Sequence, residues 1–234
     1  MAAARPRHGY RRLGVLLARE GYRVKHKCVQ RLCRDEGLRV QARRRKRSRV
    51  ETSTIPNDRP AAQYPKHVWA LYFAYDETTD CRTLKVLNIT AEYTRHALAI
   101  DVERSMTGDD IVTVLERLIM IHGAPGFVRM DNGTEMTSNA VADWCRFSPT
   151  GIVFIDPGSP WQNAYVESFT GRLRDELLAI EVFHTLLEAK VMAEDYRQQY
   201  NAHRPHSSLG YLTPDEFALQ WSNTNPGLTK SLAH

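Results

Sequence analysis

The chain has 234 residues, of which 42% are apolar and 25% are charged. This composition is typical of a soluble globular protein with one sizeable domain and an appendage. No run of eighteen apolar residues occurs, and no apolar stretch follows the first residues. Neither a membrane span nor a secretory signal is therefore predicted, and the cytoplasm is the expected location.

Positive charge is concentrated in the first part of the chain. Residues 1–50 contain 17 Lys and Arg against three acids, a net charge of +14, which leaves −9 for the remainder of a chain whose total is +5. A basic segment attached to a mildly acidic body predicts a polyanionic partner that is bound mainly by that segment. The alternative is a basic surface that is merely solvated.

The cysteines give no sign of a metal site. They form no Cys-x-x-Cys pair and match no zinc-ligand spacing. Unpaired, mostly buried thiols are therefore predicted for Cys28, Cys33, Cys81 and Cys145.

Two short amphipathic helices are predicted within the basic segment. The first covers about residues 9–20 and stops at Gly21, and the second covers about residues 25–36 and stops at Gly37. Basic residues occupy much of the second helix outside its apolar stripe, as in helix-turn-helix modules that lie along DNA; a basic helical pair of another kind is the alternative. The residues expected to contact DNA here are Arg11, Arg12, Lys25, Lys27, Arg31 and Arg34.

Composition divides the chain into four segments. Residues 1–47 form the predicted DNA-binding segment, and residues 48–66, which contain several Ser, Thr and Pro, form a predicted linker. Residues 67–222 form the predicted core, and residues 223–234 form a tail. The basic run that ends the first segment is expected to follow a phosphate backbone; it consists of Arg43, Arg44, Arg45, Lys46 and Arg47.

The predicted core alternates between strand and helix patterns. Three closely spaced strands predict an antiparallel meander, and they are followed by a helix that ends at Gly123, a strand, a helix, a strand and two more helices. This order predicts an α/β fold with a mixed sheet and helices on both faces. The predicted strands cover residues 68–75, 83–90, 97–102, 127–130 and 152–155, and the helices cover 109–122, 139–145, a stretch from about 163, and 186–200.

Two acids occupy positions suited to phosphodiester chemistry. Asp131 follows a predicted strand, Glu167 lies in the first turns of a predicted helix, and 35 residues separate them. Magnesium-dependent cleavage of a phosphodiester needs oxygen ligands from several elements, and this pair would supply two. Each acid also has an ordinary explanation, because Asp-Asn-Gly is a common turn and a Glu near a helix start interacts with the helix dipole.

Together these segments resemble the DDE integrase and transposase superfamily, in particular bacterial insertion-sequence transposases whose second reading frame carries the catalytic core. The resemblance covers nearly the whole chain. It rests on Trp69-Ala-Leu, Asp131-Asn-Gly, Gly158-Ser-Pro-Trp-Gln-Asn-Ala, Glu167-Ser-Phe, Gly171-Arg-Leu-Arg-Asp-Glu, Tyr200-Asn-Ala-His-Arg-Pro-His-Ser-Ser-Leu-Gly210 and Thr213-Pro-Asp-Glu-Phe217.

The resemblance implies a ribonuclease-H-like core preceded by a helix-turn-helix segment. It implies an enzyme that cleaves the DNA ends of its element and joins them to target DNA, in a bacterial cytoplasm and associated with the nucleoid. It further implies two Mg²⁺ or Mn²⁺ ions, held by Asp131, Glu167 and a third acid. Expected partners are double-stranded DNA, further copies of the chain and the product of an upstream reading frame.

The chain departs from the family pattern at the first acid. The family places an Asp three residues after the opening Trp, and this chain has Tyr72, which is neutral near pH 7 and a poor magnesium ligand. Asp76 lies on the same face of the strand but about 13 Å away, and Asp80 lies in a predicted turn. Neither is expected to replace the missing acid without a slip in strand register. Ala91 and Thr170 are further departures, from an Asp and an Asn.

The missing acid leaves two functions open. One is a transposase whose metal affinity and rate are lowered by orders of magnitude, and the other is a catalytically inactive DNA-binding remnant or regulatory partner of an active transposase. A ribonuclease-H-like nuclease that acts on RNA agrees less well with the flanking motifs.

Several further residues have competing interpretations. Gln162 and Asn163 either contact DNA or the catalytic loop, or cap a helix. Arg172 and Arg174 either face phosphates or pair with neighbouring acids, Asp175 and Glu176. Trp144 and Phe147 are expected in the core rather than stacked on bases, and a loop without a metal role is expected for His203, Arg204 and His206.

Overall fold

The computed structural model describes residues 8–38, 62–156 and 163–226. Contacts divide the chain into two compact units, one made of Met1–Arg59 and Pro205–Tyr211 and the other of Pro60–Arg204 and Leu212–His234. The predicted linker and tail lie largely outside the described residues. Among the described residues, no helix is long and apolar enough to cross a membrane.

The first unit contains the predicted pair of helices, α1 (Tyr10–Arg19) and α2 (His26–Asp35). They pack through Leu13, Val29 and Cys33. Both helices end one residue before the predicted position, and the glycines that follow them adopt left-handed backbone angles that favour glycine. Leu32, which was expected in the apolar stripe of α2, is 51% exposed and does not belong to the cluster through which Val29 and Cys33 pack against α1.

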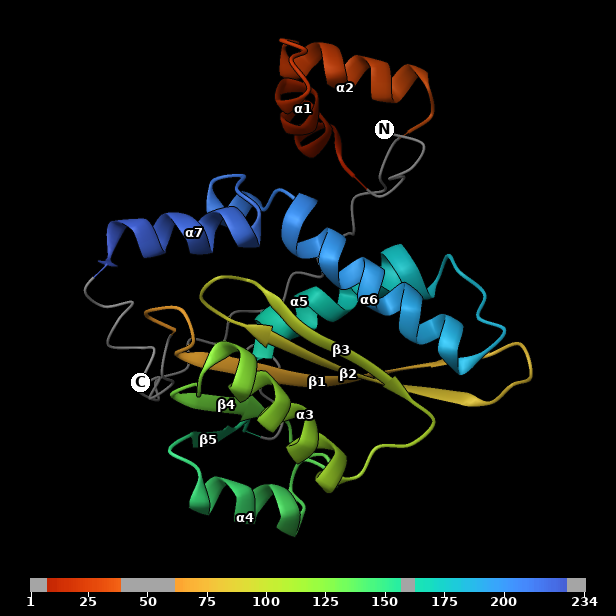
Figure 1. Cartoon of the computed structure of the whole chain (residues 1–234). Coiled ribbons are helices and arrows are strands. Elements are labelled where there is room, and N and C mark those ends of the chain that lie inside the picture. The colour runs from red at the N-terminus through yellow and green to blue at the C-terminus, as the bar shows by residue number, and fades with distance from the viewer. Residues whose placement is uncertain (1–7, 39–61, 157–162, 227–234) are drawn as a thin grey trace. The chain divides into compact units, whose positions relative to one another are not determined.

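The second unit is built on a five-stranded sheet with the strand order β3-β2-β1-β4-β5 (Figure 1). The first three strands in the sequence form the expected antiparallel meander, and β4 and β5 extend the sheet in parallel from β1. The prediction of a mixed sheet is confirmed. The strands are β1 (Val68–Glu77), β2 (Thr83–Ala91), β3 (Ala97–Glu103), β4 (Phe127–Met130) and β5 (Gly151–Phe154).

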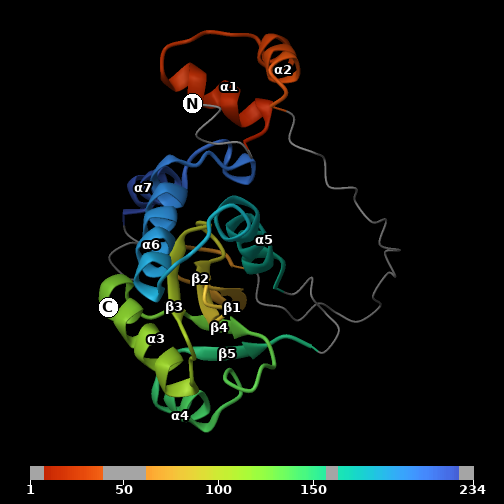
Figure 2. The ribbon, with the colours of Figure 1, turned by 90° about the vertical axis from the view of Figure 1, so that its right-hand side faces the viewer.

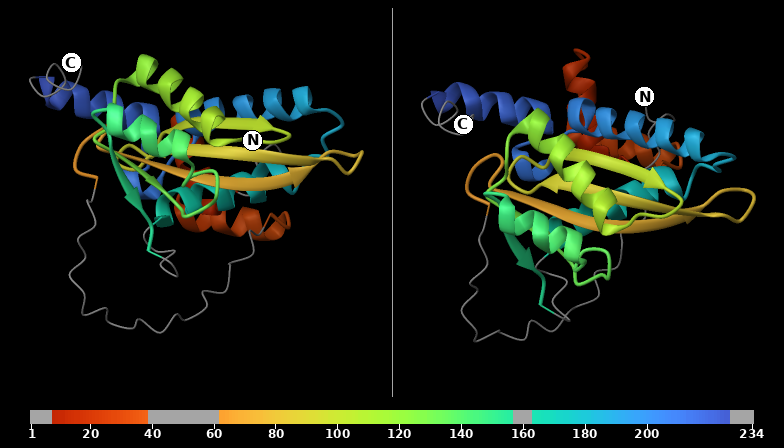
Figure 3. Two further views of the ribbon diagram at one scale, coloured as in Figure 1. Left: turned by 90° about the horizontal axis from the view of Figure 1, so that it is seen from below. Right: turned by 60° about the horizontal axis from the view of Figure 1, so that its bottom comes forward.

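Helices cover both faces of this sheet, as predicted. Figure 2 shows α3 (Gly108–His122) and α4 (Asn139–Phe147) on one face and α5 (Ala164–Leu173) and α6 (Leu186–His203) on the other, and Figure 3 views α3 and α4 in front of the strands. Side chains alternate between the faces along each strand. On β1, Trp69, Leu71 and Phe73 join the core under α3, whereas Ala74 joins the core under α5 and α6. Even-numbered β1 residues therefore face α5.

Three features of the second unit were not predicted. A helix, α7 (Pro214–Thr224), begins with a capping box between Thr213 and Glu216, and a π-helical turn (Arg174–Leu178) follows α5. The α6 helix also continues to His203, so this residue does not lie in the predicted loop.

Two burial predictions are wrong. Phe147 is 89% exposed, because it is the last residue of α4 and points away from the core that Trp144 contacts. All four cysteines are unpaired, as expected, but only Cys33 is buried. Cys81 is exposed because it lies in the turn between β1 and β2, where its φ is +59°.

Candidate active site

Tyr72 lies in the middle of the sheet on the face that is covered by α5. It pairs with Asn88 of β2, and the register is continuous from Trp69 to Glu77. The slip that would have moved Asp76 toward this position is absent from the described pairing. Tyr72 is half-buried, so its side chain is accessible from the α5 side of the sheet.

Asp131 follows directly after β4, beside Tyr72. In the parallel pairing of β1 with β4, Trp69 lies opposite Val128 and Ala70 opposite Arg129. The same register, extended by two residues along both strands, places Asp131 opposite Tyr72. Val128 and Met130 point into the core under α3, so alternation turns Asp131 toward α5. Its Oδ1 accepts a hydrogen bond of 3.0 Å from the Gly133 backbone N–H, which leaves Oδ2 for another ligand.

Glu167 is carried by α5, which crosses β1 and β2 (Figures 1 and 2). Two hydrogen bonds fix the facing side of this helix: Asn163 Nδ2 donates to the Leu71 carbonyl at 3.2 Å, and Asn88 Nδ2 donates to Thr170 Oγ1 at 3.3 Å. Residues 163, 167 and 170 share one helix face because they are four and three residues apart. Glu167 is thus located over the part of the sheet that holds Tyr72 and Asp131.

The electrostatic setting of Glu167 differs from that of an ordinary surface acid. The side chain is half-buried, and burial raises the pKa of its carboxyl. Partly buried acids with a raised pKa are common at functional sites. A cation bound next to Glu167 would favour the charged form of its carboxyl and so oppose this shift.

The other acids of β1 and its turn do not complete the site. Asp76 is four residues beyond Tyr72, about 13 Å along the strand. Burial raises the pKa of its carboxyl, and the hydrogen bond from the Glu77 backbone N–H partly opposes this effect. Asp80 lies in the turn after β1 and accepts a hydrogen bond from Thr78 Oγ1 at 2.5 Å. Among the described residues, no three His, Cys, Asp or Glu side chains are grouped as metal ligands.

Asn163 and Arg172, both expected to contact DNA, have neighbours within the protein. Asn163 is fully buried, and its side chain makes no helix-capping hydrogen bond, because it is directed at β1. Asn163 thus occupies the N-cap position of α5 without capping it through its side chain, and its burial does not agree with a DNA contact. Burial raises the pKa of the Tyr200 hydroxyl, and the neighbouring Arg172 guanidinium partly opposes this shift. Gln162 lies outside the described residues.

Glu176, which was expected to pair with Arg172 or Arg174, has a different partner. Glu176 pairs with Arg204, which reaches it from beyond the end of α6, and Tyr196 also donates to Glu176 at 3.2 Å. The sequence offered no signal for this pair because its members are 28 residues apart and lie on different elements. It ties the π-helical turn after α5 to α6.

The basic residues of the helix pair are largely accessible. Arg12 is the exception, since it is half-buried and its Nε donates to the Pro205 carbonyl at 3.0 Å within the same unit. The run of residues 43–47 lies outside the described residues. Exposed basic residues in α1 and α2 and at their ends include Arg11, Lys25, Lys27, Arg31 and Arg34.

Asn88 and Thr170 are site residues that sequence reasoning did not assign. Asn88 is fully buried, pairs with Tyr72 and bonds Thr170 on α5. A buried Asn in an otherwise apolar strand is the signal that could have identified it, because buried amides need hydrogen-bond partners. Thr170 was noted only as a departure from the family pattern.

The fold and the location of these acids define a protein with an integrase-type core. Family models described as "Integrase core domain" match residues 62–160 and 150–214, and one described as "HTH-like domain" matches residues 2–47. The catalytic core domain of HTLV-2 integrase, solved with magnesium, has a TM-score of 0.54 at 13% identity and aligns over 68% of this chain and 99% of its own. That of BIV integrase has a TM-score of 0.52 at 19% identity, over 68% and 98%.

Proteins of bacterial insertion elements are similar over almost the entire chain. The 31.7 kDa protein of insertion element IS407 from Burkholderia multivorans is 40% identical over 94% of this chain and 78% of its own length. The transposase of element IS904 from Lactococcus lactis is 27% identical over 90% and 87%. The chain belongs to the family of bacterial insertion-element transposases with an integrase core domain.

Proposed function

We propose that this transposase binds the DNA ends of its element and that its site for cleavage and joining of DNA, at Asp131 and Glu167, works at a strongly reduced rate because Tyr72 replaces an acid. The observation that carries the proposal is the convergence of Tyr72, Asp131 and Glu167 on one face of the sheet. DNA is held by the basic helix pair and its following basic run, and copies of the chain assemble on it.

The donor set at this site fits one divalent cation better than two. Asp131 and Glu167 offer carboxylate oxygens, the ligands that Mg²⁺ prefers, with water free to complete the coordination. Tyr72 contributes only a neutral phenol, so no third carboxylate is present to hold two ions together. A bound divalent cation supplies the charge that activates an attacking oxygen and stabilises a leaving one.

The protein residues have separate tasks in this proposal. Gly133 orients the Asp131 carboxylate through its backbone N–H. Asn163 and Thr170 hold the facing side of α5, and with it Glu167, against the sheet. Tyr72 fills the position of a negative charge with an uncharged ring, which weakens cation binding and therefore the reaction.

The experiment compares Tyr72→Asp with Tyr72→Asn, since the two side chains have nearly the same size and differ in charge. Magnesium- or manganese-dependent cleavage of the element's own DNA ends is measured for both variants and for the natural chain. We expect the cleavage rate of Tyr72→Asp to exceed that of the natural chain at least about a hundredfold. Mutation of a residue that only orients a metal ligand already lowers metal affinity or activity about 10–100-fold, and Tyr72→Asp restores a ligand itself. Tyr72→Asn should remain near the natural rate.

Two results would contradict this proposal. Cleavage by the natural chain as fast as by Tyr72→Asp would show that no acid is missing. Inactivity of Tyr72→Asp, with salt-dependent DNA binding intact, would instead favour a second function, that of a DNA-binding partner without chemistry. That alternative is supported by the neutral side chain at position 72.

A further inference from the structure

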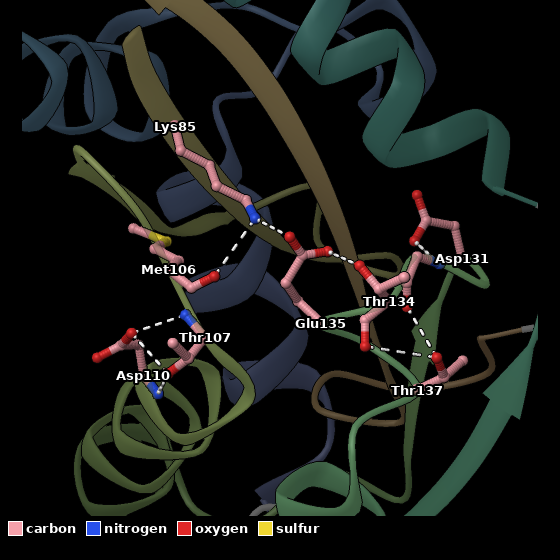
Figure 4. Close-up of polar contacts among 9 residues, drawn as sticks. Lys85, Met106, Thr107, Asp110, Asp131, Thr134, Glu135 and Thr137 are labelled. Carbon is pink, nitrogen blue, oxygen red and sulfur yellow. Dashed lines mark hydrogen bonds and ion pairs between the residues drawn. The ribbon is translucent and has the colours of Figure 1, made fainter. Parts of the chain in front are cut away.

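The loop that carries Asp131 is anchored on the opposite face of the sheet. It connects β4 to α4 through residues 131–138. Met136 is fully buried in the core under α3, and Glu135 beside it reaches Lys85 on β2 (Figure 4). Asp131, at the start of the same loop, faces α5. The loop therefore passes from the acid site to an anchor elsewhere in the unit.

Lys85 is an unusual residue for the interior of a sheet. It is only 7% exposed, and its Nζ donates to Glu135 and, at 3.3 Å, to the Met106 carbonyl. The ammonium also lies 4.3 Å from the centre of the Phe73 ring. A buried ammonium is costly unless it is paired with an acid and hydrogen-bonded, and Glu135 supplies that acid. Lys85 shares a face with Phe73, so it does not face Tyr72 or Glu167.

Hydrogen bonds connect this ion pair to Asp131 through the loop. The second carboxylate oxygen of Glu135 accepts from Thr134 Oγ1 at 3.0 Å. The Thr137 hydroxyl and backbone N–H both donate to the Gly133 carbonyl at 3.0 Å, and the Gly133 N–H donates to Asp131. Figure 4 shows this series of contacts, with the Lys85–Glu135 pair at one end and Asp131 at the other.

Close packing at the end of the loop limits its movement further. A Cβ added at Gly108, the first residue of α3, would lie 1.8 Å from Ser138 Oγ and 3.3 Å from the Glu135 carbonyl. The loop thus lies against α3 backbone that has no side chain at this point. The ion pair, the buried Met136 and this contact together restrict the conformations that are open to Asp131.

We propose that Lys85 and Glu135 are positioning residues: the ion pair between the buried Lys85 ammonium and the partly exposed Glu135 carboxylate holds the 131–138 loop so that the Asp131 carboxylate is presented on the α5 face. This inference rests on the proposed role of Asp131 as a metal ligand. In this proposal neither Lys85 nor Glu135 is a ligand of the cation or of DNA. Their effect on the reaction is transmitted through the loop.

The first test measures loop order without any requirement for activity. Amide hydrogen exchange of peptides covering residues 131–138 is compared for the natural chain, Glu135→Gln, Lys85→Met and the double variant. We expect exchange to accelerate at least about tenfold in all three. Global stability should fall in the single variants and recover in the double variant, because removing both charges leaves no unpaired buried charge.

The Lys190–Glu103 pair provides a matched control. It joins the same residue types on α6 and β3, but its side chains are 40% and 43% exposed and remote from the loop. Lys190→Met and Glu103→Gln should leave exchange in residues 131–138 unchanged. Protection of the loop at the natural level in the double variant would overturn the proposal, because the pair would then be stabilising the fold without ordering the loop.

The second test uses the Tyr72→Asp background. Adding Glu135→Gln should lower Mn²⁺ affinity and kcat by about 10–100-fold, which is typical when a residue that orients a metal ligand is changed. The KM for DNA should stay unchanged. Unaltered Mn²⁺ affinity and kcat would overturn the inference and leave the proposed function standing. If Tyr72→Asp itself neither binds Mn²⁺ nor cleaves, the proposed function fails, and the exchange test alone decides whether the pair orders the loop.

Discussion

The Tyr72 side chain lies between Asn88 of β2 and the end of β4. The strand around it is intact, and Trp69 and Leu71 beside it are fully buried. A strand needs only a side chain that fits a half-buried, pleated surface, and tyrosine does so well. A divalent cation needs negative charge at the same place. Tyr72 is therefore compatible with the fold and, in the proposed function, unfavourable for the reaction.

The half-buried Glu167 carboxyl gives a pH-dependent prediction. Burial raises its pKa, so the stability it contributes is present below its unfolded pKa and is lost as the pH rises through the folded pKa. We expect Glu167→Gln, which mimics the neutral form, to increase the free energy of unfolding at pH 7. This gain should vanish below about pH 4, where both states are protonated. Urea unfolding at the two pH values measures it.

Glu194 serves as a control, because its pKa is shifted in the opposite direction to that of Glu167. Hydrogen bonds from Arg197 lower the pKa of Glu194, so its charged form is stabilised in the folded chain. Glu194→Gln should therefore reduce stability at pH 7, with a smaller effect near pH 4. A loss of stability at pH 7 in Glu167→Gln would contradict the expected setting of Glu167.

At the scale of elements, β4 is held in place by a buried ion pair. Arg129, two residues before Asp131, donates to Glu92 in the turn between β2 and β3, and both side chains are 1% exposed. Glu92 also donates its backbone N–H to the Val68 carbonyl at 3.0 Å. The pair connects the short strand that leads to Asp131 with the long hairpin on the other side of β1.

Removing one member of this pair should be strongly destabilising. Glu92→Gln leaves a buried guanidinium without its counter-charge, and we expect a loss of about 3–5 kcal/mol in the free energy of unfolding. Asp101→Asn, which breaks the more exposed pair with Arg117, should cost only about 0.2–1 kcal/mol. Denaturant unfolding compares the two. Similar costs for both variants would show that the Arg129–Glu92 pair has no special role.

The sequence predicted most of the individual helices and strands, but not the side-chain contacts between them. The β4 and α2 patterns are local, since hydrophobic periodicity and flanking turn residues are encoded within a few positions, and their bounds were predicted within one residue. The α7 helix was missed although Thr213 and Glu216 form a recognisable capping box. The Arg129–Glu92 pair could not be predicted, because it depends on which strands become neighbours.

At the scale of the whole molecule, charge is divided unevenly between the two ends of the sequence. The first 50 residues carry +14 and the remainder −9. Of the described basic residues, Lys25, Lys27, Arg31 and Arg34 lie exposed on or next to α2. Binding of this surface to duplex DNA releases counterions, so affinity should fall steeply with salt.

The salt dependence of DNA binding gives a further prediction. Arg31→Ala and Arg34→Ala should each weaken binding to duplex DNA and reduce the slope of log affinity against log salt by about 1. Arg146→Ala is the control, because Arg146 is an exposed arginine of the core that pairs with Asp143. Fluorescence anisotropy between about 50 and 200 mM salt covers the informative range. An equal change in slope for Arg146→Ala would refute the assignment of DNA binding to α2.

The amino-acid sequence alone determined the family, the order of the strands and of the helices up to α6, and the candidate site residues Tyr72, Asp131 and Glu167. These properties depend on local periodicity and on motifs that are contiguous in the chain. Only the tertiary structure decided that Asn88 and Thr170 hold α5 to the sheet, that Asn163 is buried, and that Lys85 reaches Glu135. Such contacts depend on strand register and helix orientation, which are set by packing between residues far apart in the sequence.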